Sequence, residues 1–168
     1  CAGVPPSPPS PPLASPVVAD PLRLLELCAV SDGAAAVILG TESQARRLGV
    51  PLVRVSGYAT ATGTFGDPAT RIPTISTNAV QGAAHTSEVA GAASRAMAMA
   101  GIGPEDVDLV ELADNSVWQV LAWPEMLGFF EPGQSDWMLA HGEMAIDGKL
   151  PVNPSGGFLS FGEATTAQ

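Results

Sequence analysis

Apolar and polar positions along this chain alternate between strand-like runs and helix-like periodicity. Small and β-branched residues follow a turn dipeptide in 31–40, which predicts a buried strand over 34–39. Val, Thr and Tyr dominate 51–63 and predict a second strand over 52–62, and the apolar run 107–112 predicts a third. Helices are predicted over 21–27 with Pro21 at the first position, over 41–48, from residue 86 or 87 to 100, and from Asn115 onward, with a helical turn at 103–106.

The ends of these helices carry local signals. Thr41 can cap the second helix, and Thr86 or Ser87 can cap the third. Gly101 ends the third helix, whereas Pro124 must kink or break the last one because it lacks a backbone N–H. Since helices alternate with strands, the sequence predicts an α/β fold with helices packed on both faces of a mixed sheet.

The N-terminal segment differs in composition from the rest. Residues 5–12 read PPSPPSPP, so we expect a flexible Pro-rich linker over 1–17 and one domain over 18–168. The chain begins with Cys1 rather than Met, and its last segment, PVNPSGGFLSFGEATTAQ, stops within a glycine-rich loop. We interpret it as a piece of a longer protein, with the domain truncated at its end.

Charge and composition exclude several classes of protein. Acidic residues outnumber basic ones 17 to 7, and the net charge of −10 would repel nucleic acid. No run approaches the roughly 18 apolar residues that span a bilayer, so we expect no membrane association and a cytoplasmic location. Cys1 and Cys28 are too few for a disulfide framework, and we interpret both as thiols.

Two carboxylates have polar neighbours at predicted loop edges. Asp114 precedes Asn115, and Glu163 precedes two threonines. Either carboxylate could perform acid–base chemistry. The alternatives are that Asp114 caps the helix beginning near Asn115 and that Glu163 is solvated. Gly157 and Gly162 have the spacing of a phosphate-binding P-loop, but Glu163 stands where that loop needs lysine.

Other candidate residues give weaker indications. His85 and His141 lie far apart without further ligand-type neighbours, so no metal site is expected. Arg46 and Arg47 are most simply a solvated helix face, although a phosphate-bearing ligand would find few other cations.

Four stretches in order resemble one family. VADPLRLLELCAVSDGAAAVIL, AMAGIGPEDVDLVEL, ADNSVWQVLAWPEMLGF and GKLPVNPSGGFLSFG are similar to the C-terminal half of thiolases, in the branch of sterol-carrier-protein-X and lipid-transfer-protein thiolases. The resemblance implies a thiolase-like layered fold and acyl transfer or carbon–carbon cleavage on a coenzyme A thioester in lipid or steroid catabolism. It implies no permanently bound cofactor.

The resemblance also assigns residues, and two positions depart from the family pattern. Thiolases have an Asn or His at the position of Ala113 and a loop histidine at the position of Glu163. The nucleophilic cysteine of the family belongs to the other half. Because a carboxylate only accepts protons and hydrogen bonds when ionised, Glu163 fits proton abstraction in a retro-aldol cleavage better than thiolysis. The alternative is a non-catalytic module that binds acyl-CoA or stabilises a partner.

Further assignments follow from the same resemblance. Asp114 and Asn115 join Glu163 as candidate catalytic residues. Cys28 lies near the expected pantetheine position, where a buried small apolar residue is the alternative. The expected partners are acyl-CoA, a second copy or a complementary thiolase-like half, and an OB-fold zinc-ribbon protein such as related lipid-transfer proteins have. The loop residues expected beside the thioester, where they would bind its coenzyme A portion, are Ser155, Gly156, Gly157 and Gly162.

Overall fold

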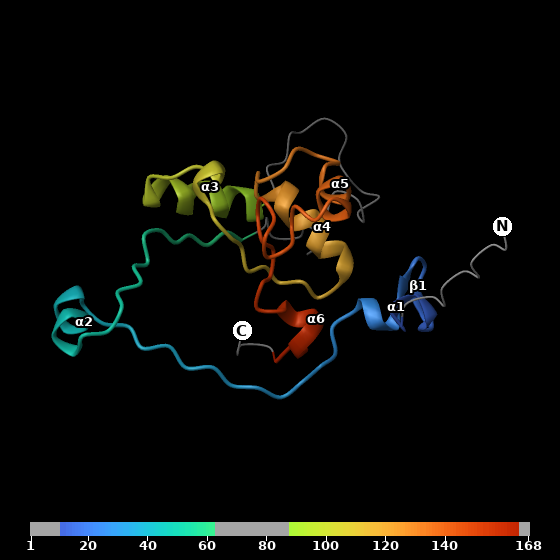
Figure 1. Ribbon diagram of the computed structural model, residues 1–168, viewed down its shortest axis with the longest axis horizontal. Helices are drawn as coiled ribbons and strands as arrows, with labels where there is room; N and C mark the ends of the chain where they lie inside the picture. The colour runs from blue at the N-terminus through green and yellow to red at the C-terminus, as the bar shows by residue number, and fades with distance from the viewer. Residues whose placement is uncertain (1–10, 63–87, 165–168) are drawn as a thin grey trace, which may run out of the picture. The chain divides into compact units, whose positions relative to one another are not determined.

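The computed structural model describes residues 11–62 and 88–164 (Figure 1). The chain divides into two compact units. Unit 1 comprises Cys1–Val37, Leu109–Leu121 and Gly142–Gln168, and unit 2 comprises Ile38–Asp108 and Ala122–His141. In the described parts of both units, no helix is long and apolar enough to cross a membrane.

Short helices make up most of the regular structure. In chain order the elements are α1 (Pro11–Ala14), β1 (Val17–Ala19), β2 (Leu22–Arg23), the 3₁₀ turn η1 (Leu24–Glu26), α2 (Glu42–Leu48), α3 (Glu88–Ala100), the 3₁₀ turn η2 (Pro104–Asp106), α4 (Val117–Met126), α5 (Ser135–Ala140) and α6 (Gly157–Phe161). β1 and β2 pair antiparallel. This two-stranded ribbon is the one sheet among the described residues.

The predicted helices α2 and α3 are confirmed. Thr41 caps α2 because its hydroxyl accepts the Gln44 amide, while the Gln44 side chain accepts the Thr41 amide at 2.9 Å. Gly101, at φ 73°, follows the last residue of α3 in the left-handed conformation that glycine adopts without strain. The proposed caps Thr86 and Ser87 lie outside the described residues.

The predicted helix over 21–27 is wrong, and the linker has local structure at its end. β2 and η1 occupy this segment, because the Glu26 carboxylate accepts the Arg23 amide at 2.8 Å and the Leu24 amide bonds the Pro16 carbonyl. These contacts favour a tight turn over a continuous α-helix. α1 and the first residue of β1 fall within the expected linker 1–17.

α4 contains Pro124 within its last turn and ends two residues later, at Met126. The proline is fully buried. A proline this close to the end of a helix removes one late backbone hydrogen bond, so the predicted break takes the form of an early stop.

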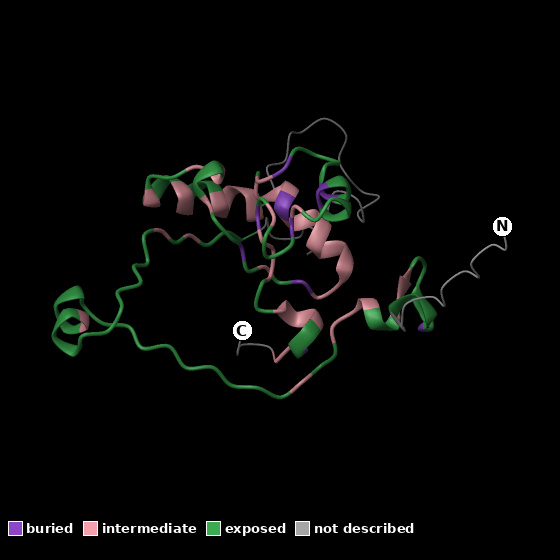
Figure 2. Cartoon of the chain, viewed as in Figure 1, coloured by how far each residue is buried: buried purple, intermediate pink, exposed green. Residues whose placement is uncertain are grey.

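The strands predicted over 34–39 and 52–62 do not form in the described residues. Both stretches flank α2 as plain tubes in Figure 1 and are mostly exposed in Figure 2. Ile38 is 98% exposed and Val53 is 90% exposed. The second stretch contacts a helix and not a neighbouring strand. The Arg95 side chain of α3 donates to the Thr60 carbonyl at 2.7 Å. A strand needs a hydrogen-bonded partner, and apolar sequence alone does not provide one.

The third predicted strand, 107–112, does not form as a strand either, but Val110 within it finds one backbone partner in unit 1. Val110 and Val152 form a parallel bridge, in which the Val110 amide bonds the Pro151 carbonyl and the Asn153 amide bonds the Val110 carbonyl. The Asn153 side chain continues this pairing by accepting the Leu112 amide at 2.6 Å and donating to its carbonyl at 3.1 Å. The buried apolar residues of unit 1 gather around this pair: Val110, Met144 and Leu150.

Candidate functional site

Three separate segments of unit 1 meet at the candidate site. Leu27 bridges Ser116 antiparallel, and Val30 bridges Glu163 in parallel. The Glu163 amide donates to the Ala29 carbonyl at 2.7 Å. Backbone pairing therefore fixes Glu163 beside the segment that follows η1.

The same pairing brings the side chains of Cys28, Asn115 and Glu163 together. Asn115 Nδ2 donates to Glu163 Oε2 at 2.7 Å, and the Cys28 thiol donates to that oxygen at 3.8 Å. Asn115 Nδ2 also lies 3.9 Å from Cys28 Sγ. Both of these donors use Oε2, and no side chain or amide within 11–62 and 88–164 donates to Oε1.

This arrangement leaves a carboxylate oxygen able to take a proton. Two donors hold Oε2 and so limit rotation of the Glu163 carboxylate, while its other oxygen keeps its lone pairs. All three side chains are partly exposed, so a ligand can reach them. Cys28 is a free thiol that donates to Glu163, and its position near the pantetheine stays a prediction.

Gly162 serves close packing of the backbone. It adopts φ 79°, and a Cβ there would lie 2.7 Å from both the Ala29 carbonyl oxygen and the Ser31 hydroxyl. Any side chain would push Glu163 away from its backbone partners. Gly156 lies at the start of α6 with φ 110°, another conformation that favours glycine.

Asp114 fixes α6 within unit 1. Its side chain is 2% exposed, and its Oδ1 accepts the Phe158 amide at 2.6 Å. Gly157, at φ 60°, approaches so closely that a Cβ would overlap the carboxylate. A carboxylate is well placed against a helix N-terminus because the amides there have no partner within the helix. Asp114 thus caps a helix 44 residues away rather than the helix that begins just after it.

An open cavity of about 740 Å³ lies in unit 1 beside α6. Its lining comes from the segment after Ser31, from 111–113 and from the glycine-rich loop, and it includes the predicted residues Ser155 and Gly157. The carboxylates on its wall are those of Asp32 and Glu111. Sequence reasoning missed both carboxylates and also Asn153, although an Asn before Pro is a turn signal.

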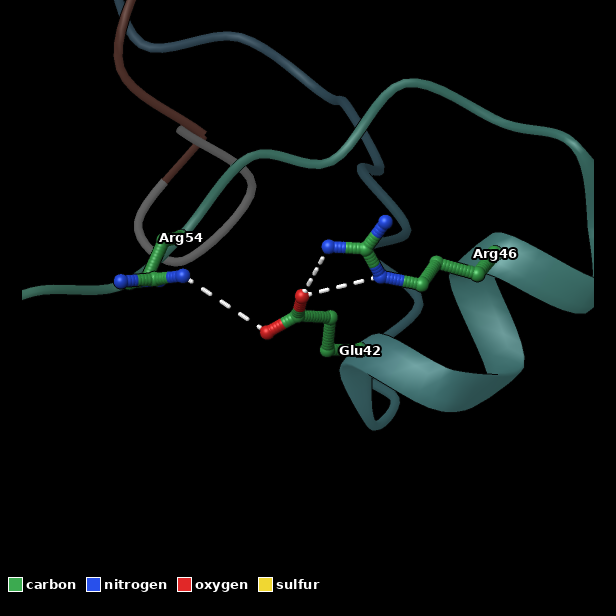
Figure 3. Close-up of polar contacts among 3 residues, drawn as sticks. All are labelled: Glu42, Arg46 and Arg54. Carbon is green, nitrogen blue, oxygen red and sulfur yellow. Dashed lines mark hydrogen bonds and ion pairs between the residues drawn. The ribbon is translucent and has the colours of Figure 1, made fainter.

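Arg46 of α2 and Arg54, which follows α2, form surface ion pairs with Glu42 in unit 2. Glu42 pairs with Arg46 at 2.5 Å and with Arg54 at 3.6 Å (Figure 3). The side chains of both arginines are more than two-thirds exposed, at 75% and 71%. The solvated face predicted for Arg46 is confirmed, and the carboxylate between the arginines offsets their attraction for a phosphate.

The histidines do not join a metal-like cluster in the described segments. His141 Nδ1 lies 2.8 Å from the Trp137 carbonyl oxygen, and its ring stacks on the Trp137 ring at 4.0 Å. His85 lies outside the described residues. Within 11–62 and 88–164, no group of three or more His, Cys, Asp or Glu is placed to hold a metal ion.

Known proteins similar to this chain agree on its family. Acetyl-CoA acetyltransferase of Methanothermobacter thermautotrophicus is 41% identical over 88% of this chain and 36% of its own length. A steroid side-chain-cleaving aldolase of Thermomonospora curvata is 30% identical over 88% of this chain and 36% of its own. The chain thus spans about a third of the length of these curated relatives.

A solved structure shows the fold. The chain superposes on one named Ltp2-ChsH2(DUF35) aldolase with a TM-score of 0.68, at 24% identity, over 91% of this chain and 38% of that one. The family described as Thiolase C-terminal domain-like matches residues 73–167. The predicted α/β thiolase-like fold class is therefore confirmed, and this chain belongs to the Thiolase C-terminal domain-like family.

Proposed function

We propose that this chain is the part of an enzyme, one that cleaves a carbon–carbon bond of a coenzyme A thioester, that supplies the general base, Glu163. The observation that carries the proposal is the fixation of Oε2 by Asn115 and Cys28, with Oε1 accepting no hydrogen bond from the described residues. A base must be held in place and must keep a lone pair for the proton. The relative named a steroid side-chain-cleaving aldolase supports carbon–carbon cleavage in steroid catabolism as the reaction class.

The proposed step is a retro-aldol cleavage of a β-hydroxyacyl-CoA. Glu163 Oε1 accepts the proton of the β-hydroxyl, and the oxygen's electron pair forms a carbonyl. The bond between the α and β carbons breaks, and its electrons move to the α carbon as a thioester enolate. Protonation of that carbon, with Glu163 returning the proton, gives a shortened acyl-CoA and a free ketone or aldehyde.

Acyl transfer to a thiol, as the name of the acetyltransferase relative states for that protein, fits this site less well. Such a reaction benefits from donors to the developing oxyanion, and an ionised carboxylate offers none. Ala113 also brings no polar group to the cavity wall. These features favour proton abstraction over thiolysis.

The proposal includes a protein partner of the thiolase-like kind, either a second copy or a complementary half. Support comes from the exposed apolar side chains of unit 2, including Ile38 and Val53, which are 98% and 90% exposed. Exposed apolar residues in this number are typical of interfaces. An OB-fold zinc-ribbon protein is a further proposed partner, in line with the two-component name of the aldolase structure.

The test is turnover of a β-hydroxyacyl-CoA and a β-ketoacyl-CoA by the protein as its gene encodes it, before and after Glu163→Gln. Turnover of the hydroxy substrate should fall by about 10²–10⁴-fold, with substrate binding nearly unchanged, because only the proton acceptor is removed. Glu105→Gln is the matched control, since Glu105 is an exposed residue of η2. If the wild type turns over neither substrate, the chain is a binding module and the proposal is wrong.

A further inference from the structure

The cavity beside α6 is lined on one side by aromatic and small apolar residues. Phe158 and Phe161 of α6 line it, as does Ala113. Phe161 is 66% exposed, so its ring offers apolar surface that nothing in the described residues covers. A volume of about 740 Å³ lies within the range of roughly 300–1,000 Å³ that sites for small organic molecules occupy.

The charges on the cavity wall are negative. Asp32 and Glu111 line it, and none of the lining residues is Lys or Arg. Two carboxylates raise the energy of a phosphate placed here, and no cation offsets them. The wall therefore favours an uncharged ligand.

Three hydrogen-bond donors of the glycine-rich loop beside the cavity are already taken. Loops of this composition hold phosphates through backbone N–H and hydroxyl groups. Here the Ser155 amide donates to Glu111 Oε1 at 3.0 Å, and the Ser155 hydroxyl donates to Oε2 at 2.7 Å. The Phe158 amide donates to Asp114 at 2.6 Å. Internal carboxylates thus occupy three donors that a phosphate could otherwise use.

We infer that this cavity receives the uncharged, ring-sized acyl group of the substrate and that the phosphates of coenzyme A bind elsewhere. The inference rests on the proposed function, because it names the part of the same thioester that this cavity holds. It also reassigns Ser155 and Gly157, which we expected to contact the cofactor portion, to the acyl portion. Ala113 then sets the depth of the acyl site, since a larger side chain there would fill it.

Equilibrium dialysis with two matched steroids tests this inference. Pregnenolone is uncharged, and pregnenolone sulfate has the same skeleton with an anionic group. Pregnenolone should bind saturably to the protein as its gene encodes it and more tightly than the sulfate. Coenzyme A itself should not displace pregnenolone.

Variants locate the binding. Ala113→Trp should weaken pregnenolone binding by tenfold or more, whereas Ala145→Trp, at an exposed turn of the same unit, should leave it unchanged. Phe161→Ala removes a largely exposed ring, so folding is retained while affinity falls. Glu111→Gln should lower the ratio of the affinity for pregnenolone to the affinity for pregnenolone sulfate by about fivefold. This is the effect of removing one unit charge at about 4 Å from the sulfate in water.

Three results would overturn the inference: no saturable pregnenolone binding, equal affinity in Ala113→Trp and Ala145→Trp, or displacement of pregnenolone by coenzyme A. Each is independent of catalysis. Glu163→Gln should bind pregnenolone as the wild type does. If Glu163 proves not to be the base, the binding result still stands, and if pregnenolone does not bind, the role of Glu163 as the base is unaffected.

Discussion

Two apolar runs of similar composition have opposite outcomes in this chain. The run 107–112 pairs with 151–153, and Val110 is 8% exposed. The run 52–62 forms no strand in the described residues, and Val53 is 90% exposed. Both are rich in the residues that favour strands. The difference shows that a backbone partner, which Asn153 helps to supply, decides whether such a sequence is paired and buried, although 107–112 gains a single bridge and not a full strand.

The paired region is also the one that carries the candidate chemistry. The loop after Asn153 leads to α6 and Glu163, and each step is fixed by a hydrogen bond within unit 1. In the described residues, the exposed run in unit 2 is held by an exposed ion pair of Arg54 with Glu42 and by contacts of Gly57 and Thr60 with α3. Changes in the first region should therefore cost more stability than changes in the second.

The largest stability effect is expected at Gly157. Gly157→Ala should lower the free energy of unfolding by about 3 kcal/mol, because φ is 60° and the new Cβ would meet the Asp114 carboxylate. Gly91→Ala in α3 is the matched control, where no atom lies within 4 Å, and it should stabilise by about 1 kcal/mol. Urea unfolding measures both, and equal stability of Gly157→Ala and wild type would contradict the geometry at α6.

A pair of valines compares the two runs directly. Val110→Ala should destabilise by about 2 kcal/mol, from two lost methyl groups and the space they leave. Val53→Ala should change stability by less than about 0.5 kcal/mol because that side chain is exposed. Thermal unfolding of both variants measures the two losses in stability. Similar losses for Val110→Ala and Val53→Ala would mean that 52–62 is buried in the protein.

Asn115 should act through Glu163. Asn115→Ala should lower kcat about tenfold with little change in KM, because the carboxylate loses its shortest hydrogen bond but remains present. Asn115→Asp, which places a second carboxylate beside Oε2, should lower it further. Steady-state kinetics separate kcat from KM, and an effect confined to KM would show that Asn115 contacts substrate instead.

The smallest effect concerns Glu125 in unit 2. Burial raises the pKa of this carboxyl, but backbone hydrogen bonds from Gly133, Ser135 and Gln134 outweigh it and lower the pKa below 4.5. The Ser135 amide lies 2.9 Å from Glu125 Oε1. The pKa of Glu125 is lower in the folded than in the unfolded protein. Its contribution to stability is therefore complete above pH 4.5 and is lost as the pH falls through the folded-state pKa.

Glu125→Gln should therefore destabilise by about 0.5–1 kcal/mol at neutral pH, a small value because the group is partly exposed. The gap between wild type and variant should close in acid. Urea unfolding at several pH values measures the difference in free energy of unfolding between wild type and Glu125→Gln. If this difference grew in acid, the pKa of Glu125 would be raised in the folded protein and not lowered.

Local features of the structure could be predicted from sequence, and distant contacts could not. Thr41 and Gly101 act on their own helix, so their positions are sufficient to predict its ends. The contact between Cys28 and Glu163 joins residues 135 positions apart, which no spacing rule reveals. Sequence reasoning offered acid–base chemistry or capping of the adjacent helix for Asp114, yet the fold brings α6 to it instead.

The pH dependence of turnover tests the role of Glu163 most directly. Turnover of a β-hydroxyacyl-CoA by the protein as its gene encodes it should fall toward acid pH, because protonated Glu163 cannot accept the β-hydroxyl proton. In Glu163→Gln the remaining turnover should be about 10²–10⁴-fold lower and should lack this acidic limb. An unchanged acidic limb in the variant, with turnover within a few-fold of wild type, would contradict the assignment of Glu163 as the base.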